Sequence, residues 1–225
     1  MRHAVGALLR KELRLELRAP TTLTGMALFS VTTFVVFHFG LDRDTVEGQL
    51  AAGVLVVTLL FAAMLGINRL FVTDEEEGGF DGFLLAPVDR TALLVAKATA
   101  LFSFLVLLEL FALPVFALLL LEPGLDVGLL WRAAVVLLLA DAGIAVVGTL
   151  VAALGIQTRA RDLLVPLIAL PLLVPVVIGT ARALAPVFDA AGAGALPGRW
   201  LAILGLYDLV FGLLAYAVFD FLVED

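Results

Sequence analysis

The sequence predicts an all-α integral membrane protein with six transmembrane helices. Of its 225 residues, 63% are hydrophobic and 16% are charged, whereas a soluble domain is about 45–50% apolar and about 25% charged. Six apolar runs each approach or exceed the roughly 20 residues that a helix needs to cross a bilayer. These runs are continuous rather than alternating, which favours helices over strands. We expect one domain that covers residues 1–225.

The predicted spans alternate with short polar connections. They cover residues 21–41, 50–72, 91–121, 129–155, 163–181 and 200–222. The third and fourth exceed the minimum length, so we expect them to tilt or to extend beyond the membrane. The fifth contains Pro166, Pro171 and Pro175, and each proline removes a backbone donor, which predicts a kinked or broken helix. The linker 182–199 is too long and too apolar for a plain turn, so we expect short re-entrant or interfacial helices there.

The distribution of basic residues predicts a multi-pass membrane protein with both termini in the cytoplasm. With the N-terminus inside, ten of the 14 Lys and Arg residues fall in cytoplasmic segments and four in outer segments. This asymmetry follows the positive-inside rule. Trp131 and Trp200 then lie at the outer interface, where aromatic residues are typical anchors.

Residues 1–20 have the pattern of an amphipathic helix. Apolar residues recur every four positions, and Arg10, Arg14 and Arg18 form a second stripe. Such a helix lies in the cytoplasmic interface with its arginines toward anionic lipid head groups. It serves either as a topology anchor or as a helix that also contacts a cytoplasmic partner.

Several chemistries are disfavoured by the residues present. The chain has no Cys, which excludes disulfides and thiolate metal sites. Neither Lys11 nor Lys97 lies in a GxxxxGK[ST] loop, so we do not expect the chain to bind ATP by that route. His3 and His38 do not form an HExxH site, and no basic stripe beyond the N-terminus suggests nucleic acid. We therefore expect a transport subunit rather than an enzyme, with no metal and no cofactor of its own.

Ionisable residues fall inside the predicted spans. Glu109, Asp141 and Asp208 lie in spans three, four and six, and carboxyls at that depth usually face a protein interior or a water-filled path. They indicate a substrate pathway or a proton relay, or else hydrogen bonds between helices. His38 lies near the outer end of span one, where it either ligates a metal or heme from outside or is simply an interfacial residue. Small residues that permit close helix approach also recur, as Ala62 and Gly66, Gly143 and Gly148, and Gly205 and Gly212.

The segment DEEEGGFDGFLLAPVDR between spans two and three combines acidic and apolar residues. On a helix, Phe80, Phe83 and Leu84 share one face, and acidic residues share another. This pattern predicts a short cytoplasmic helix that docks a partner protein, and a solvated acidic loop is the alternative. The spacing does not match a DxDxDG calcium loop. The residues assigned to docking are Asp74, Glu75, Glu76, Glu77, Phe80, Asp81, Phe83, Leu84, Leu85 and Pro87.

The wider stretch FVTDEEEGGFDGFLLAPVDRTALLVAKA resembles the signature of ABC-2-type export permeases. The matching positions are Glu75, Glu77, Gly79, Leu84, Leu85, Pro87, Arg90 and Lys97. In that group a coupling helix lies at this place and docks into a groove of a separate ATPase. The resemblance implies that segment 74–87 has the same role here, with ATP bound by the partner.

Within that group, the chain is most similar to the heme exporter protein B family (CcmB) of cytochrome c maturation. The opening LLRKELRLELRAP and the stretch GVLVVTLLFAAMLGINRLF, which includes Gly66, Asn68 and Arg69, carry the likeness. It implies a homodimer with an ATPase subunit, further cytochrome c maturation membrane subunits and a periplasmic heme chaperone. ATP hydrolysis would either export heme or release the heme-loaded chaperone.

Other functions stay open from the residues themselves. A generic ABC-2-type exporter of lipid, drug or glycan shares the same signature. An ion-coupled secondary transporter would use Glu109, Asp141 and Asp208 instead of a partner's ATP. A scaffold that only assembles other subunits would use neither.

Overall fold

A computed structural model describes residues 2–41, 45–72, 90–121, 127–155, 160–189 and 194–222. These residues form helices joined by turns and irregular connections, without a strand among them. Six of the helices are long and apolar enough to cross a membrane, which confirms the predicted fold class. The helices are α1 (Arg2–Arg18), α2 (Thr21–Gly40), α3 (Gly48–Arg69), α6 (Arg90–Leu120), α7 (Val127–Gly155), α8 (Arg161–Leu184) and α9 (Gly198–Leu222).

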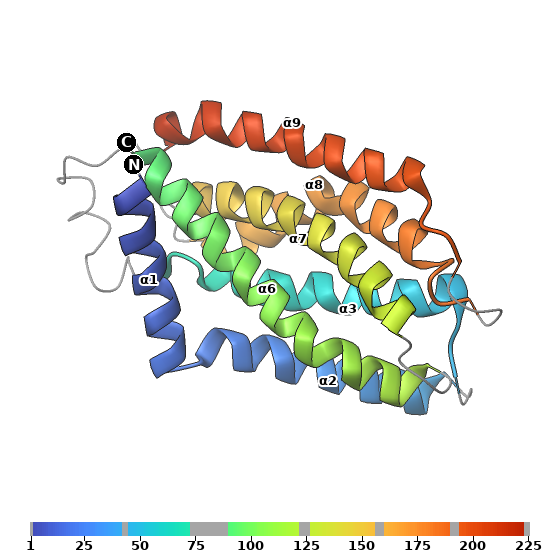
Figure 1. Ribbon diagram of the computed structural model, residues 1–225. Coiled ribbons are helices and arrows are strands. Elements are labelled where there is room, and N and C mark those ends of the chain that lie inside the picture. The colour runs from blue at the N-terminus through green and yellow to red at the C-terminus, as the bar shows by residue number, and fades with distance from the viewer. Residues whose placement is uncertain are drawn as a thin grey trace.

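The six spans run up and down, so that their connections alternate between the two ends of the bundle (Figure 1). Main-chain hydrogen bonds hold the connections at one end together: Val46 N–H donates to Leu120 C=O at 2.8 Å, and Gly48 N–H to Phe188 C=O at 2.7 Å. Gly48 has a φ of 52°, a conformation that favours glycine. We call this the loop end, and the opposite end, where α1 begins and α9 finishes, the terminal end.

The core of the bundle forms where α7 packs against its neighbours, α8 and α9 above all (Figure 1). Gly148 of α7 permits one close approach, because a Cβ there would lie 2.7 Å from Ile67 of α3 and 3.1 Å from Leu101 of α6. By contrast, a Cβ on Gly205 or Gly212 of α9 would meet no atom within 4 Å. Of the small residues that recur in the spans, Gly148 therefore serves packing within one copy of the chain, whereas Gly205 and Gly212 do not.

The span with three prolines is not broken. Helix α8 is continuous from Arg161 to Leu184, with Pro166, Pro171 and Pro175 inside it. The hydroxyl of Tyr207 on α9 donates to the Leu172 carbonyl at 2.7 Å, one turn before Pro175. This hydrogen bond joins α9 to the proline-rich part of α8.

The linker between α8 and α9 differs from the expected short helices in the parts that the structure describes. Residues 185–188 form turns that continue from α8, and residues 194–197 are irregular. Gly194 is held through both of its main-chain polar groups. Its N–H donates to Pro186 C=O at 2.7 Å, and its C=O accepts from Arg132 Nη1 at 2.7 Å. Polar contacts to the main chain thus replace helical hydrogen bonds in this connection.

Helix α1 crosses the terminal end of the bundle at a steep angle to the spans (Figure 1). It packs mainly on α6, and Leu8 reaches the hydrophobic core. Leu17, at the other end of the predicted apolar stripe, is 82% exposed. The predicted N-terminal helix is therefore present, with one part against the bundle and one part open to its surroundings.

Candidate functional site

The predicted docking segment, residues 74–87, lies outside the described residues, but the two chain ends that carry it are described. The chain leaves α3 through Leu70 and Phe71 and returns at Arg90, where α6 begins. Both points lie at the terminal end, beside α1 (Figure 1). The predicted docking segment is therefore connected to the membrane spans through these two attachments.

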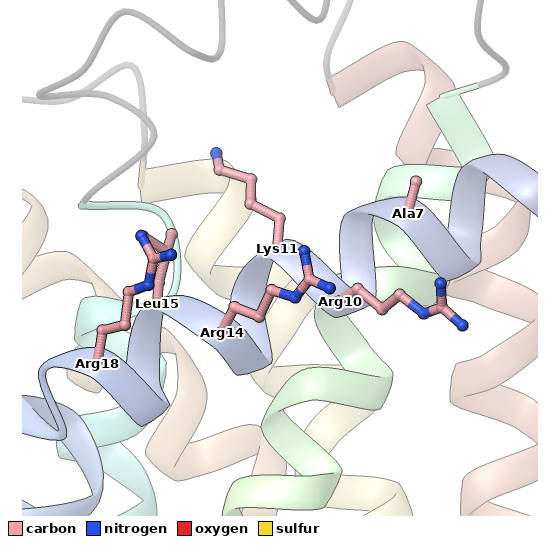
Figure 2. Close-up of a pocket in the computed structure, with 6 residues that line it drawn as sticks. All are labelled: Ala7, Arg10, Lys11, Arg14, Leu15 and Arg18. Atoms are coloured by element: carbon pink, nitrogen blue, oxygen red, sulfur yellow. The ribbon is translucent and has the colours of Figure 1, made fainter.

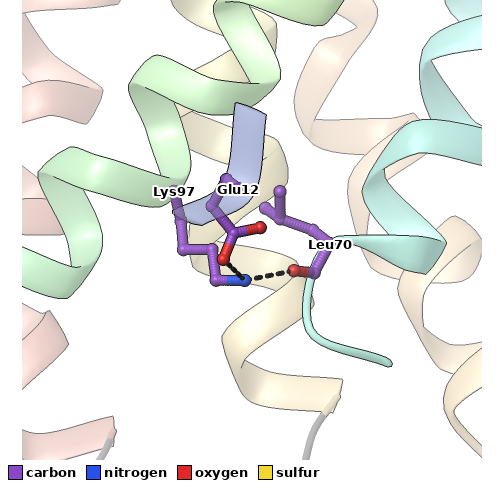
Figure 3. Close-up of polar contacts among 3 residues, drawn as sticks. All are labelled: Glu12, Leu70 and Lys97. Carbon is purple, nitrogen blue, oxygen red and sulfur yellow. Dashed lines mark hydrogen bonds and ion pairs between the residues drawn. The ribbon is translucent and has the colours of Figure 1, made fainter. Parts of the chain in front are cut away.

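A buried lysine holds the first attachment. Lys97 of α6 is 2% exposed, and its Nζ lies 2.9 Å from Glu12 Oε1 of α1. The same ammonium donates to the main-chain carbonyl of Leu70 at 2.7 Å. Figure 3 shows the three residues converging from α6, α1 and the end of α3. We call Glu12, Leu70, Phe71 and Lys97 the Lys97 junction.

The surroundings of the Lys97 junction make the lysine's charge hard to displace. Its Nζ lies 5.0 Å from the ring centroid of Phe71, within the range of a cation–π interaction. Phe71 itself is 1% exposed. A buried charge that loses one partner is strongly destabilised, so the ion pair and the Leu70 carbonyl keep the three chain segments together.

Arginine 161 ties a further span to the same end. Arg161, the first residue of α8, is buried, and its Nη2 donates to the Asn68 carbonyl of α3 at 2.9 Å. The last turn of α3 is thus held by cations from α6 and from α8. Sequence reasoning assigned no role to Glu12 or Arg161, although a lysine inside a long apolar run, such as Lys97, is itself a signal of a buried partner.

The outward side of α1 carries a basic groove. It encloses about 470 Å³ and is lined by Ala7, Arg10, Lys11, Arg14, Leu15 and Arg18. Arg10, Arg14 and Arg18 are exposed and follow one another along the helix (Figure 2). The groove can accept an anionic group, as the arginine stripe in the sequence predicts.

Two of the three intramembrane carboxyls meet in the core. Glu109 of α6 and Asp141 of α7 are 6% and 4% exposed, and both side chains line one small cavity. Asp208 of α9 contacts α7 at another residue: its Oδ1 lies against Gly143, 2.6 Å from where a Cβ would be.

His38 lies at the loop end of α2. It is distant in sequence from Glu109 and Asp141, and a main-chain carbonyl holds its ring. Its Nδ1 lies 2.6 Å from the Leu119 carbonyl oxygen. A carbonyl oxygen can only accept, so Nδ1 carries the proton of this hydrogen bond, and in the neutral form of the ring Nε2 keeps a lone pair. This is the arrangement in which a histidine can ligate a metal through Nε2. Within the described ranges no three His, Asp or Glu residues gather as a metal site.

Comparison with known sequences decides the family. The sequence profile of the family described as "CcmB protein" matches residues 3–221. The chain belongs to the CcmB protein family. Its relatives include "Heme exporter protein B" of Rhodobacter capsulatus, 37% identical over 174 residues, 76% of this chain and 78% of the relative.

Other CcmB family members are similar over comparable lengths. "Heme exporter protein B" of Bradyrhizobium diazoefficiens is 31% identical over 216 residues, which are 95% of this chain and 96% of that protein. The protein of the same name from Paracoccus denitrificans is 35% identical over 180 residues, 79% and 80% of the two chains. The Lys97 junction, the carboxyl pair and His38 all lie inside the residues that match the CcmB profile.

Proposed function

We propose that this chain is the membrane permease subunit of an ATP-driven ABC-type complex in c-type cytochrome biogenesis. The observation that carries the proposal is membership of the CcmB family over residues 3–221. Heme is the proposed substrate, because relatives in several bacteria are named heme exporters. The complex either exports heme or releases a heme-loaded chaperone.

The proposed assembly has several components. A cytoplasmic ATPase subunit binds ATP, two copies of this chain form the transmembrane part, and further maturation subunits and a heme chaperone act beside them. The terminal end faces the cytoplasm of the inner membrane, which follows from the basic residues gathered there in the sequence. With this orientation, the Arg residues of the α1 groove face anionic lipid head groups.

The ATPase acts through the docking segment in this proposal. Residues 74–87 bind the ATPase, with Phe83 and Leu84 on the apolar face and acidic residues at the rim, because interfaces commonly combine an apolar anchor with a charged surround. Movement of the segment then pulls on Leu70 and Phe71. Since Lys97 holds Leu70 to α1 and α6, the three helices shift as a rigid body.

The substrate route is proposed to include His38, Glu109, Asp141 and Asp208. His38 offers Nε2 at the loop end, which is the outer side in this orientation, and imidazole nitrogen is a common axial ligand of heme iron. The carboxyls line the interior of the membrane part. Heme reaching the outer side would thus meet one nitrogen ligand at His38.

Co-purification with the ATPase tests the docking segment. The full-length chain is expressed with the ATPase subunit from the same genome, extracted in mild detergent and captured by a tag on the chain. Phe83→Asp and Leu84→Asp should remove the ATPase from the captured material while leaving the chain in the membrane fraction. Val88→Asp is the matched control, because it makes the same chemical change in the same connection outside the predicted apolar face. Full ATPase recovery with both Phe83→Asp and Leu84→Asp would contradict the docking role.

A further inference from the structure

Glu109 and Asp141 bring two carboxyl groups to one small cavity, and a hydrogen bond between two carboxyl groups requires a proton on one of them. Carboxylate oxygens only accept hydrogen bonds, and a carboxyl becomes a donor when it is protonated. Both side chains are more than nine-tenths buried, and they come from different helices, α6 and α7. Asp141 lies at the midpoint of α7, so the pair is deep in the membrane part.

The pair borders a small cavity that contains no countercharge. The cavity has a volume of about 20 Å³. It is lined by Val56, Leu59, Leu60, Glu109, Leu137, Ala140, Asp141, Ile144, Val176, Val177 and Thr180. Among the lining residues that the structure describes, the two carboxyls are the titratable groups, and no Lys, Arg or His from α3, α6, α7 or α8 is present. Two ionised carboxylates in such apolar surroundings would be costly.

One buried polar atom of the residues that line the cavity has no hydrogen-bond partner among the described residues. This atom is Asp141 Oδ2, which is fully buried. Thr180, on the cavity wall, donates its hydroxyl to Val176 C=O at 2.7 Å, which leaves the Thr180 oxygen free to accept. A cavity needs about 10–15 Å³ and two to four polar partners to hold a water molecule. The volume and the three polar side chains meet both requirements.

We propose that Glu109 and Asp141 form a proton-binding site in the bundle core, with one proton shared between the carboxyls and one water molecule bound in the cavity between Asp141 and Thr180. The water bridges Asp141 to Thr180, and the shared proton links α6 to α7. A movement that separates these two helices opens the pair to water and lets it ionise. The site therefore couples the packing of α6 and α7 to uptake and release of a proton.

Infrared spectroscopy on the purified full-length protein in lipid nanodiscs tests the shared proton. The wild type at neutral pH should show a carboxylic acid C=O stretching band that shifts in D₂O. The double variant Glu109→Gln/Asp141→Asn should lose the component due to the pair. Asp208→Asn, which changes a carboxyl on α9, should retain that component. The proposal would be overturned if the spectrum of the wild type minus that of the double variant lacked this band. It would also be overturned if the band were absent and Na⁺ stabilised the wild-type protein more than choline did.

Two further measurements do not depend on the folding of the double variant. Dicyclohexylcarbodiimide modifies protonated carboxyl groups in apolar surroundings, so peptide mass spectrometry of the treated wild type should find the adduct on Glu109 or Asp141. An adduct found only on other residues would overturn the protonated pair. Thr180→Val removes the water's second partner, and it should shift the frequency of the carboxylic acid band. An unchanged frequency would overturn the bound water.

Discussion

Lys97 of α6 and Glu12 of α1 form an ion pair, with 2.9 Å between Nζ and Oε1, at a place where the lysine is 2% exposed. The pair joins residues that are 85 positions apart in the chain. It also fixes Leu70, which lies between α3 and the predicted docking segment. Helix α1 is thereby connected to the region that we propose binds the ATPase.

Removing either partner of this ion pair should destabilise the protein. Lys97→Met leaves the Glu12 carboxylate, whose side chain is 14% exposed, without its cation, and Glu12→Gln removes the carboxylate partner of the buried Lys97 ammonium. Loss of one partner of a buried pair costs on the order of 3 kcal/mol. Thermal unfolding followed by size-exclusion chromatography in detergent measures the effect.

Controls separate the ion pair from a general effect of altered charge. Arg10→Gln changes an exposed cation on the same helix, and its melting temperature should stay close to that of the wild type. The double variant Glu12→Gln/Lys97→Met should be less destabilised than the sum of the single variants, because neither charge of this ion pair remains without the other. Strict additivity would show that the two side chains do not depend on each other.

Gly148→Ala should also lower stability. The added Cβ would lie 2.7 Å from Ile67 and 3.1 Å from Leu101, so α7 would have to move away from both α3 and α6. Overpacking of this kind costs about 1–3 kcal/mol. Gly205→Ala is the matched control in the same assay, since its Cβ would meet no atom within 4 Å. Equal melting temperatures for Gly148→Ala and wild type would show that this contact adapts without strain.

His38→Ala should weaken heme binding by the purified chain. The Leu119 carbonyl fixes the ring through Nδ1, which leaves Nε2 as the nitrogen available to iron. Titration with hemin, followed by the shift of its main absorption band, measures the affinity, and we expect at least a tenfold loss. His3→Ala changes the only other histidine and should bind hemin as the wild type does. Identical titrations for His38→Ala and wild type would remove His38 from the proposed route.

The spans were predictable to within a few residues because hydropathy and length determine which segments can cross a bilayer. The fifth span, predicted as residues 163–181, is Arg161–Leu184 in the structure. At its N-terminal end, Arg161 has a carbonyl partner on α3, which neighbouring residues in the sequence cannot reveal. The break that the three prolines suggest does not occur, since α8 continues through all of them.

The candidate site was predictable in its residue types but not in its pairings. Glu109 and Asp141 stood out as carboxyls in apolar runs, yet their contact depends on how α6 and α7 are rotated against each other. Asp208 has the same sequence signal and lies elsewhere. Glu12 gave no signal, because a glutamate in an amphipathic helix is ordinarily solvated, and only the crossing of α1 over α6 brings it to Lys97.

Deletion of the gene in the source organism tests most directly whether this chain serves c-type cytochrome biogenesis. Membranes of the deletion strain are separated by electrophoresis and stained for covalently bound heme. We predict that holo-cytochromes c are lost and that a plasmid copy of the wild-type gene restores them. Holo-cytochromes c at wild-type levels in the deletion strain would contradict the claim and favour a generic ABC-2-type exporter.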